Sequence, residues 1–266
     1  MKKPLLFFPA VLFFIHFSYS QQDSTQFYKA SDGTRIYFEQ KGQGYPVVLV
    51  HGFTNTGDSW KHAALYDTLL GDGYRVITVD LRGNGRSGKP HDESYYAHDA
   101  EARDIMGILD QLGVDKYDVI GYSRGSIITA RLLVLDPRVR KAVLGGMGDD
   151  FTNPMWPRRV LFYHVLAGDT TVPELQGLLN RIEKEGMDRQ ALALSQKQQP
   201  STSREALSHL KNPVLVICGD EDEDNGSAKK LAEIIPGAKY RTVPGKHGGT
   251  NNTIPFAHEI MLFLKS

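Results

Sequence analysis

The sequence predicts an α/β fold in which a mostly parallel, twisted sheet carries helices on both faces. From residue 35 onward, strand-like runs alternate with segments of helical periodicity, and the strand-like runs are dominated by apolar residues, as at 46–50 and 214–217. Strands buried on both faces have this composition, and a strand–helix alternation favours parallel pairing. The overall composition is also that of a globular protein, since 41% of the 266 residues are hydrophobic and 23% are charged.

The expected elements can be placed in order along the chain. Strands are predicted at 35–40, 46–50, 74–79, 117–120, 141–144, 213–218 and 239–243. Helices are predicted at 60–70, 98–112, 126–133 and 261–265. The second helix has apolar residues at steps of three and four, the spacing of one helix face: Ala102, Ile105, Met106, Leu109 and Leu112.

One stretch interrupts the alternation and predicts a helical cap. Between about 149 and 208 there is no strand pattern, only helix-like segments at 158–167 and 173–185. An insertion at this point would stand over the carboxyl ends of the strands, where open α/β sheets bind ligands. Five residues near its start are expected either to line an apolar pocket or to form the seam between cap and core: Met155, Trp156, Leu161, Phe162 and Tyr163.

Charge and cysteine content limit the partners. Lys plus Arg and Asp plus Glu both number 31, so the net charge is zero and nothing favours nucleic acid. The single cysteine, Cys218, excludes intramolecular disulfides and a multi-cysteine metal site, and we interpret it as a small buried residue. The expected partner is a small-molecule substrate. The sequence does not indicate an oligomeric state.

The N-terminus predicts an export signal. Lys2 and Lys3 precede an apolar run over 5–17, and the small residues at 18–20 provide a cleavage site after Ser20. The run is short for a bilayer span, which needs about 20 residues. We expect 1–20 to be removed, leaving a periplasmic or secreted chain, 21–266, without a membrane span. An uncleaved anchor is the alternative.

A pentapeptide at 121–125 supports a hypothesis about chemistry. It reads Gly-Tyr-Ser-Arg-Gly and lies between the strand at 117–120 and the helix at 126–133. G-x-S-x-G at a sharp strand-to-helix turn exposes the serine hydroxyl and directs helix N-terminal N–H groups toward a developing oxyanion. The glycines are expected because a tight turn leaves little room for side chains. Ser123 is therefore the predicted nucleophile.

A serine nucleophile needs a base and an acid that orients the base. His247 follows the last predicted strand in a loop with several glycines, which places it at the carboxyl edge of the sheet with Ser123. The acid is expected in the run Gly-Asp-Glu-Asp-Glu-Asp at 219–224. We select Asp222 as this acid. The alternatives are Asp224, Asp220 and, outside the run, Asp149.

With nucleophile, acid and base in the order Ser123, Asp222, His247, the chain resembles the α/β-hydrolase superfamily, of the compact, capped, single-domain kind. The resemblance extends from about residue 35 to the end of the sequence. Chymotrypsin-like and subtilisin-like enzymes have other chain orders. Four further segments carry the resemblance: the H-G loop at 51–54, the D-x-R-G-x-G-x-S turn at 80–87, the G-x-x-D pattern of Gly219 and Asp222, and Gly245 with His247.

The resemblance implies the α/β-hydrolase fold, with the cap inserted after the sixth strand, and a serine esterase reaction that uses neither a metal nor an organic cofactor. It also implies an oxyanion hole made by the backbone N–H groups of Phe53 and Arg124. Bracing roles follow for His51, Asp80 and Arg82. Serine as nucleophile argues against a haloalkane dehalogenase or epoxide hydrolase, whose family pattern has aspartate there.

Two questions stay open at this point. Arg124 departs from many family members, which have a small or apolar residue after the nucleophile. Its side chain either lies away from the pocket or engages the cap or an anionic group of the substrate. The reaction is also open: the same triad could cleave amides, lactones or carbon–carbon bonds or transfer acyl groups, and a ligand-binding or signalling protein with little turnover is a further alternative.

Overall fold

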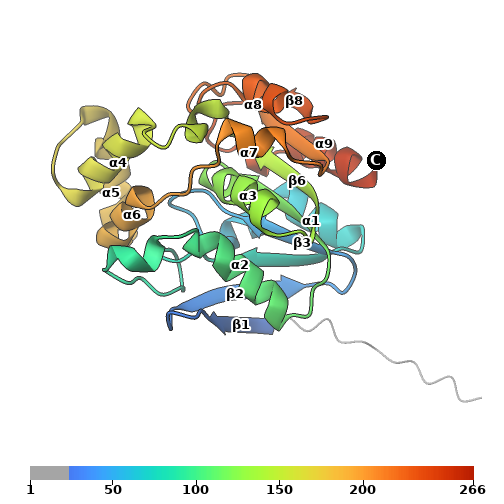
Figure 1. Ribbon diagram of the computed structural model, residues 1–266, viewed down its shortest axis with the longest axis horizontal. Helices are drawn as coiled ribbons and strands as arrows, with labels where there is room; N and C mark the ends of the chain where they lie inside the picture. Colours follow the sequence, from blue (N-terminus) through green and yellow to red (C-terminus); the bar gives the residue numbers. More distant parts are fainter. Residues whose placement is uncertain (1–23) are drawn as a thin grey trace, which may run out of the picture.

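The computed structural model describes residues 24–266 and shows one eight-stranded sheet covered by helices (Figure 1). The predicted signal peptide, 1–20, lies outside the described residues. Within 24–266, no helix has both the length and the apolar character needed to cross a bilayer. The strands are β1 (Ser24–Lys29), β2 (Arg35–Lys41), β3 (Pro46–Val50), β4 (Arg75–Val79), β5 (Tyr117–Tyr122), β6 (Val139–Gly145), β7 (Val214–Gly219) and β8 (Lys239–Val243).

The sheet has the predicted, mostly parallel arrangement. The strand order is β1-β2-β4-β3-β5-β6-β7-β8, and only the pairings of β1 with β2 and of β2 with β4 are antiparallel. The parallel strands β3 to β8 therefore present their carboxyl ends at one edge of the sheet. Strand β1 was missed by the sequence analysis because Ser24–Lys29 is a short edge strand without an apolar run.

Nine α-helices are present in the described part of the chain. They are α1 (Ala64–Gly71), α2 (Ala100–Gln111), α3 (Arg124–Leu135), α4 (Pro157–Ala167), α5 (Gln176–Lys184), α6 (Arg189–Lys197), α7 (Arg204–Ser208), α8 (Ala228–Ile234) and α9 (Ile254–Lys265). Short 3₁₀ helices are η1 (Gly57–His62), η2 (Glu93–Tyr96), η3 (Asp149–Thr152), η4 (Pro173–Leu175) and η5 (Thr250–Asn252).

Two buried clusters lie on opposite faces of the sheet. Val48 and Val50 of β3 pack with α2 and α3 on one face, while Val47 and Leu49 pack with α1 and α9 on the other. Successive strand side chains point to opposite faces, so a strand covered on both sides is apolar at every position. This arrangement explains the continuous apolar run that predicted β3.

Two predicted helices have different bounds in the structure. The helix expected at 60–70 is divided into η1 and α1 because Ala63 is extended, with φ −92° and ψ 139°. The final helix begins at Ile254 instead of 261, where the Thr253 side chain accepts a hydrogen bond from the Phe256 N–H. A threonine cap followed by a proline is a helix-start signal. Reading that signal would have extended the predicted helix.

The segment 149–208, which we call the cap, connects β6 to β7 and contains helices but no strand. Figure 1 shows α4, α5 and α6 gathered beyond the helices that cover the sheet. A small apolar cluster of their own joins Leu166, Ile182 and Leu192, and Phe53 from the loop after β3 packs against it. The cap is thus attached to the core next to the loop that follows β3.

Candidate active site

Ser123 lies at a strained turn between β5 and α3. Its backbone has φ 54° and ψ −123°, a region that side-chain-bearing residues rarely adopt. A Cβ atom on Gly121 would lie 2.3 Å from the Gly125 carbonyl oxygen, and one on Gly125 would lie 2.1 Å from the Val50 carbonyl oxygen. Both glycines of the pentapeptide are therefore required by close backbone approach.

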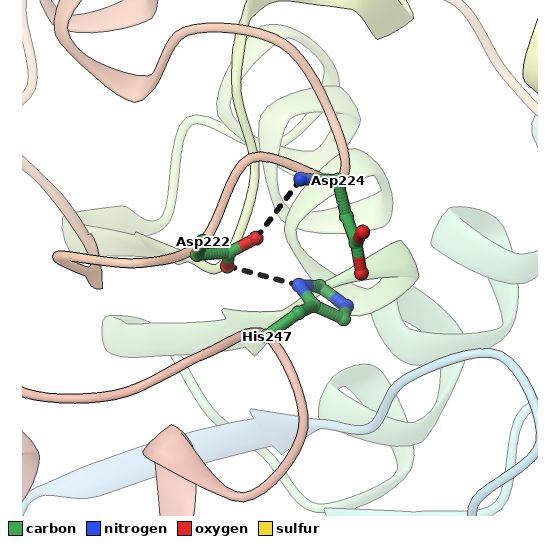
Figure 2. A group of neighbouring side chains, drawn as sticks. All are labelled: Asp222, Asp224 and His247. Atoms are coloured by element: carbon green, nitrogen blue, oxygen red, sulfur yellow. Dashed lines mark hydrogen bonds and ion pairs between the residues drawn. The ribbon is translucent and has the colours of Figure 1, made fainter.

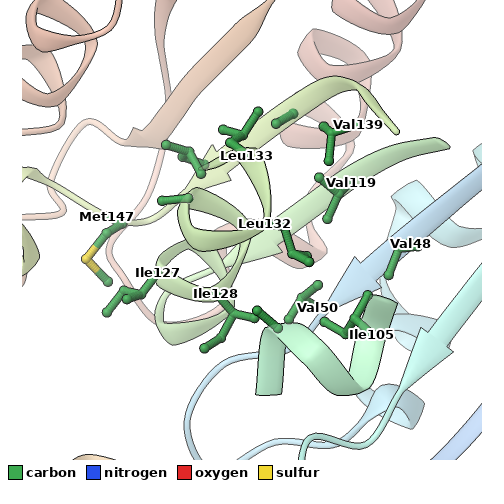
Figure 3. Close-up of a cluster of buried hydrophobic side chains, with 14 of the residues drawn as sticks. Val48, Val50, Ile105, Val119, Ile127, Ile128, Leu132, Leu133, Val139 and Met147 are labelled. Carbon is green, nitrogen blue, oxygen red and sulfur yellow. The ribbon is translucent and has the colours of Figure 1, made fainter. Parts of the chain in front are cut away.

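Helix α3 holds this turn against the sheet through apolar side chains. Ile127, Ile128 and Leu132 pack toward β3, β5 and α2 in a fully buried cluster (Figure 3). The Ser123 N–H also donates to the Gly145 carbonyl oxygen at 2.7 Å. Protein interiors are densely packed and resist displacement, so the serine is fixed relative to the sheet.

The structure brings the three predicted side chains together. His247 Nε2 lies 2.9 Å from Ser123 Oγ. On the other side of the ring, His247 Nδ1 lies 2.9 Å from Asp222 Oδ2 (Figure 2). An ionised carboxylate only accepts hydrogen bonds, so Nδ1 carries the proton and Nε2 is left to accept from the serine hydroxyl. The Asp222 side chain is 3% exposed and that of His247 is 22% exposed. The site is sheltered from water but open on one side.

The other candidate acids occupy positions in which they do not hydrogen-bond to His247. The backbone N–H of Asp224 donates to Asp222 Oδ1 at 3.3 Å, while its own side chain lies beside the imidazole (Figure 2). Asp220 accepts from the Gly245 N–H at 2.9 Å. Asp149, the alternative outside the loop, pairs with Arg204. Of the candidate acids, Asp222 is the one hydrogen-bonded to the histidine.

The same loop contains a possible metal-binding group. Asp222, Asp224 and His247 have ligand atoms within 4.8 Å of one another. Asp222 and His247, however, already share a hydrogen bond. A cation held by these three residues would compete with the hydrogen bonds of His247 to Asp222 and Ser123.

Tyr122, the variable residue before the serine, supports the histidine loop. Its hydroxyl donates to the His247 carbonyl oxygen at 2.6 Å, and the two rings stack with centroids 5.5 Å apart. Burial raises the pKa of Tyr122, so the hydroxyl keeps its donor proton. Sequence reasoning missed this residue, because the hydrogen bond joins positions 125 residues apart.

The two predicted oxyanion donors lie next to Ser123. The backbone N–H groups of Phe53 and Arg124 have no hydrogen-bond partner within residues 24–266, and both residues line the same cavity as the serine. Asn84 holds the first of these loops by donating from Nδ2 to the Phe53 carbonyl oxygen at 2.7 Å. Asn84 lies in the 80–87 turn, but its role was not anticipated.

His51 braces the loop after β3 from inside the protein. Its Nε2 accepts from the Leu81 N–H at 3.0 Å, so its Nδ1 donates to the Gly52 carbonyl oxygen at 2.7 Å. Burial lowers the pKa of His51 and keeps the imidazole neutral. Asp80 accepts from the Gly57 N–H at 2.7 Å, and Arg82 pairs with Asp104. These contacts agree with the expected bracing roles.

The Arg124 side chain engages the cap and not the cavity centre. Its Nη1 and Nη2 each lie 2.6 Å from a carboxylate oxygen of Glu101, and Nη2 also donates to the Ser195 carbonyl oxygen of α6 at 3.0 Å. Both charged side chains are buried. Since Glu101 neutralises the guanidinium, Arg124 is not a free cation for a substrate anion.

A cavity of about 290 Å³ opens between the core and the cap, above Ser123 and His247. Of the five aromatic and apolar residues singled out at the cap entry, Trp156 and Phe162 line it. Tyr163 packs in the cap cluster. Met155 and Leu161 lie on the outer surface, with 67% and 37% exposure. The predicted alternatives therefore both occur, at different residues.

Comparison with known proteins places the chain in a family. A model of the alpha/beta hydrolase fold matches residues 45–173. A non-heme chloroperoxidase from Streptomyces lividans is 30% identical over 89% of this chain and 98% of that protein. The chain belongs to the α/β-hydrolase superfamily.

Two further proteins are similar to this α/β-hydrolase, one over part of its sequence and one as a solved structure. A putative non-heme chloroperoxidase from Synechocystis is 42% identical over 41% of this chain, and the alignment spans 39% of that protein's length. The crystal structure of a bromoperoxidase from Bacillus anthracis matches with a TM-score of 0.71 and 28% identity, over 91% of this chain and all of that one. The fold and superfamily suggested by the sequence are therefore confirmed.

Proposed function

We propose that this protein is a serine hydrolase that cleaves a carboxylic ester of a small molecule through an acyl-enzyme. The observation that carries the proposal is the hydrogen-bonded chain from Ser123 Oγ through His247 to Asp222, with both links at 2.9 Å, at the floor of a cavity. A nucleophile, a base and a group that orients the base are the parts that acyl transfer requires.

The reaction follows from the roles of the atoms. Ser123 Oγ attacks the ester carbonyl carbon while its proton passes to His247 Nε2, and Asp222 stabilises the resulting imidazolium. The carbon–oxygen bond to the alcohol breaks, and the alcohol leaves with the proton from Nε2. Water then attacks the acyl-enzyme, again giving a proton to Nε2. Release of the carboxylic acid restores the serine hydroxyl.

The negative charge that develops on the carbonyl oxygen would be stabilised by the N–H groups of Phe53 and Arg124. Losing one such donor typically costs about 2.7–4 kcal/mol in the transition state. Both donors are free of other hydrogen bonds in the described chain, so neither has to break a bond to bind the oxyanion.

The test is labelling and turnover with a matched variant. Wild-type protein should react with a fluorophosphonate probe and hydrolyse p-nitrophenyl butyrate, and Ser123→Ala should abolish labelling and lower kcat by about 10⁴-fold or more. Persistent labelling of Ser123→Ala would contradict the proposal. Labelling without ester turnover would direct the search to amides, lactones or acyl transfer. Tight binding without turnover would favour a ligand-binding protein.

The relatives support one second candidate. Two of them are named as non-heme chloroperoxidases and one similar structure as a bromoperoxidase. On the same serine, hydrogen peroxide in place of water would convert the acyl-enzyme to a peracid, which can oxidise halide. Halogenation of a chromogenic diketone in acetate, bromide and peroxide tests this, and Ser123→Ala must abolish it.

We also propose that the protein is exported. The support is in the sequence alone: Lys2 and Lys3, the apolar run after them and the small residues before Gln21. N-terminal sequencing of protein recovered from the periplasm or medium should begin at Gln21. Recovery of the mature protein with residues 1–20 intact would contradict cleavage.

A further inference from the structure

The side chains that line the cavity carry more positive than negative charge. Its lining includes four arginines, and among the described residues it includes no aspartate or glutamate. Arg124 is neutralised by Glu101, which leaves Arg158, Arg159 and Arg181, all from the cap. A cleft with one sign of charge and poorly polarisable walls attracts ions of the other sign.

The three cap arginines differ in how they are compensated. Arg181 forms an ion pair with Glu185 at 3.0 Å. Arg158 has Asp224 at 4.0 Å. Arg159 has no ion-pair partner among residues 24–266; instead its Nη atoms donate to three backbone carbonyl oxygens, at 2.5–3.4 Å. Arg159 is therefore the cavity cation whose charge the described chain leaves unbalanced.

The surroundings of Arg159 make this imbalance costly. Its Nε is buried and has no hydrogen-bond partner. Burial lowers the pKa of Arg159, yet a guanidinium remains protonated at any ordinary pH. A partly desolvated charge without a counter-ion is unfavourable, so an anion that enters the cavity would relieve a cost already present in the folded protein.

Two glutamine side chains lie in the same wall. Gln196 and Gln199 are 5% and 7% exposed and both line the cavity. Their side-chain amides have no hydrogen-bond partner in the described part of the chain. Together with Arg159, these amides offer donors that the protein itself does not use.

We propose that Arg159, with the amides of Gln196 and Gln199, binds a carboxylate of the substrate, so that the preferred esters carry an anionic group remote from the scissile bond. The substrate class rests on the proposed ester hydrolysis. The rest of the wall is apolar, with Trp156 and Phe162, and about 290 Å³ accommodates a short chain or single ring. Half-esters of short dicarboxylic acids and esters of small hydroxy acids fit this description.

The chemistry needs no further reactant. One water is consumed as the ester carbon–oxygen bond breaks and an acyl–oxygen bond to water forms. A dicarboxylic half-ester gives the dicarboxylate and an alcohol, and an ester of a hydroxy acid gives the hydroxy acid and a second carboxylate. The remote carboxylate takes no part in bond changes; it positions the ester over Ser123.

The experiment compares two pairs of esters. The acyl pair is mono-p-nitrophenyl glutarate against p-nitrophenyl valerate, and the alcohol pair is 4-butyryloxybenzoate against phenyl butyrate. The measured quantity is the ratio of kcat/KM for the anionic ester to that for its neutral match. In the wild type this preference should reach about tenfold in at least one pair, as expected for a charge-assisted contact, and Arg159→Met should remove it.

Arg189 provides the matched control. Its guanidinium also braces cap backbone, donating to the Leu166 and Val165 carbonyl oxygens at 2.8 and 2.7 Å, but it does not line the cavity. Arg189→Met therefore removes the same charge and the same kind of cap contact while leaving the preference within about threefold of wild type. Arg159→Lys, which keeps the charge, should keep part of the preference. Urea unfolding of each variant checks that the cap remains folded.

The outcomes separate this inference from the proposed function. If neither ester pair shows an anionic preference, or if Arg159→Met and Arg189→Met lower it equally, carboxylate binding by Arg159 is wrong while serine hydrolysis stands. If the wild type cleaves no ester, calorimetry with glutarate on Ser123→Ala decides. Binding that weakens at least about tenfold in Ser123→Ala/Arg159→Met supports the anion site, and equal affinities overturn it.

Discussion

The carboxyl edge of the sheet and the cap meet at one cavity, but they are held in opposite ways. On the sheet side, Ser123 and His247 are fixed by backbone packing and by hydrogen bonds from buried groups such as Tyr122. On the cap side, Arg158 and Arg181 are 40% and 46% exposed and come from short helices. Reacting atoms must be held within about half an ångström, whereas a side chain that selects a substrate can tolerate adjustment.

Two residues of the site contact both regions. Arg124 follows Ser123 at the start of α3 and reaches the α6 carbonyl of Ser195, and Phe53 lies in the loop after β3 and packs on the cap cluster. In the proposed mechanism, each of these residues would act through its backbone N–H as well as through its side chain. The difference between sheet edge and cap can be tested with matched substitutions on either side.

The largest effect is expected inside the sheet-edge site. Asp222→Asn should lower kcat by about 10⁴-fold, because an amide can donate to Nδ1 and favours the wrong imidazole tautomer. Asp224→Asn makes the same chemical change two residues away and should lower kcat by less than about tenfold. The measurement is hydrolysis of a p-nitrophenyl ester. Equal losses in the two variants would show that Asp222 is not the dedicated orienting acid.

A smaller effect is expected where core and cap join. Arg124→Met leaves the Glu101 carboxylate buried without its partner, which should reduce the free energy of unfolding by about 3–5 kcal/mol. Adding Glu101→Gln should recover part of this loss. The control is Arg181→Met, which breaks an exposed pair with Glu185 and should cost less than about 1 kcal/mol. Urea unfolding measures all of them, and similar losses for the two arginines would contradict the assigned difference.

The smallest effect is a pH dependence that originates on the core side alone. Burial holds the pKa of His51 below its ordinary value of 6.5. Below about pH 6.5, His51 is therefore protonated in the unfolded chain but stays neutral in the folded protein. As a result, the free energy of unfolding decreases as the pH drops through this range.

The slope from one proton is at most about 1.4 kcal/mol per pH unit. The slope should be shallower by up to this amount in His51→Gln, whose amide oxygen can still accept from Leu81. Unfolding free energies between pH 5 and 8 provide the comparison. The same acid slope in both proteins would show that His51 is not its source.

Most of the sheet edge and the position of the helical cap could be predicted from the sequence, but the contacts of the cap side chains could not. Apolar runs identified seven of the strands, and the order Ser123, Asp222, His247 placed three side chains that the structure brings within hydrogen-bond distance. Parallel strands carry their loops to one edge, so residues that follow such strands are expected at that edge. The choice of Asp222 within its acidic run was a prediction that geometry now favours.

What was missed depends on contacts between distant parts of the chain. Nothing local marks Tyr122 as the donor to the His247 loop or Asn84 as the support of Phe53. The unbalanced charge of Arg159 is a property of how the cap folds around it, since its partners are backbone oxygens and not a carboxylate. Sequence patterns report which face of an element is buried, but not which distant groups will surround it.

The conformation of Ser123 has a consequence for how such a molecule is maintained. With φ 54° and ψ −123°, the position imposes a strain of order 1–3 kcal/mol on any residue with a side chain, and glycine would relieve it. Selection for folding alone would favour glycine here, whereas selection for reactivity demands the hydroxyl. In the proposed reaction, the need for the serine hydroxyl would explain why this strained position does not carry glycine.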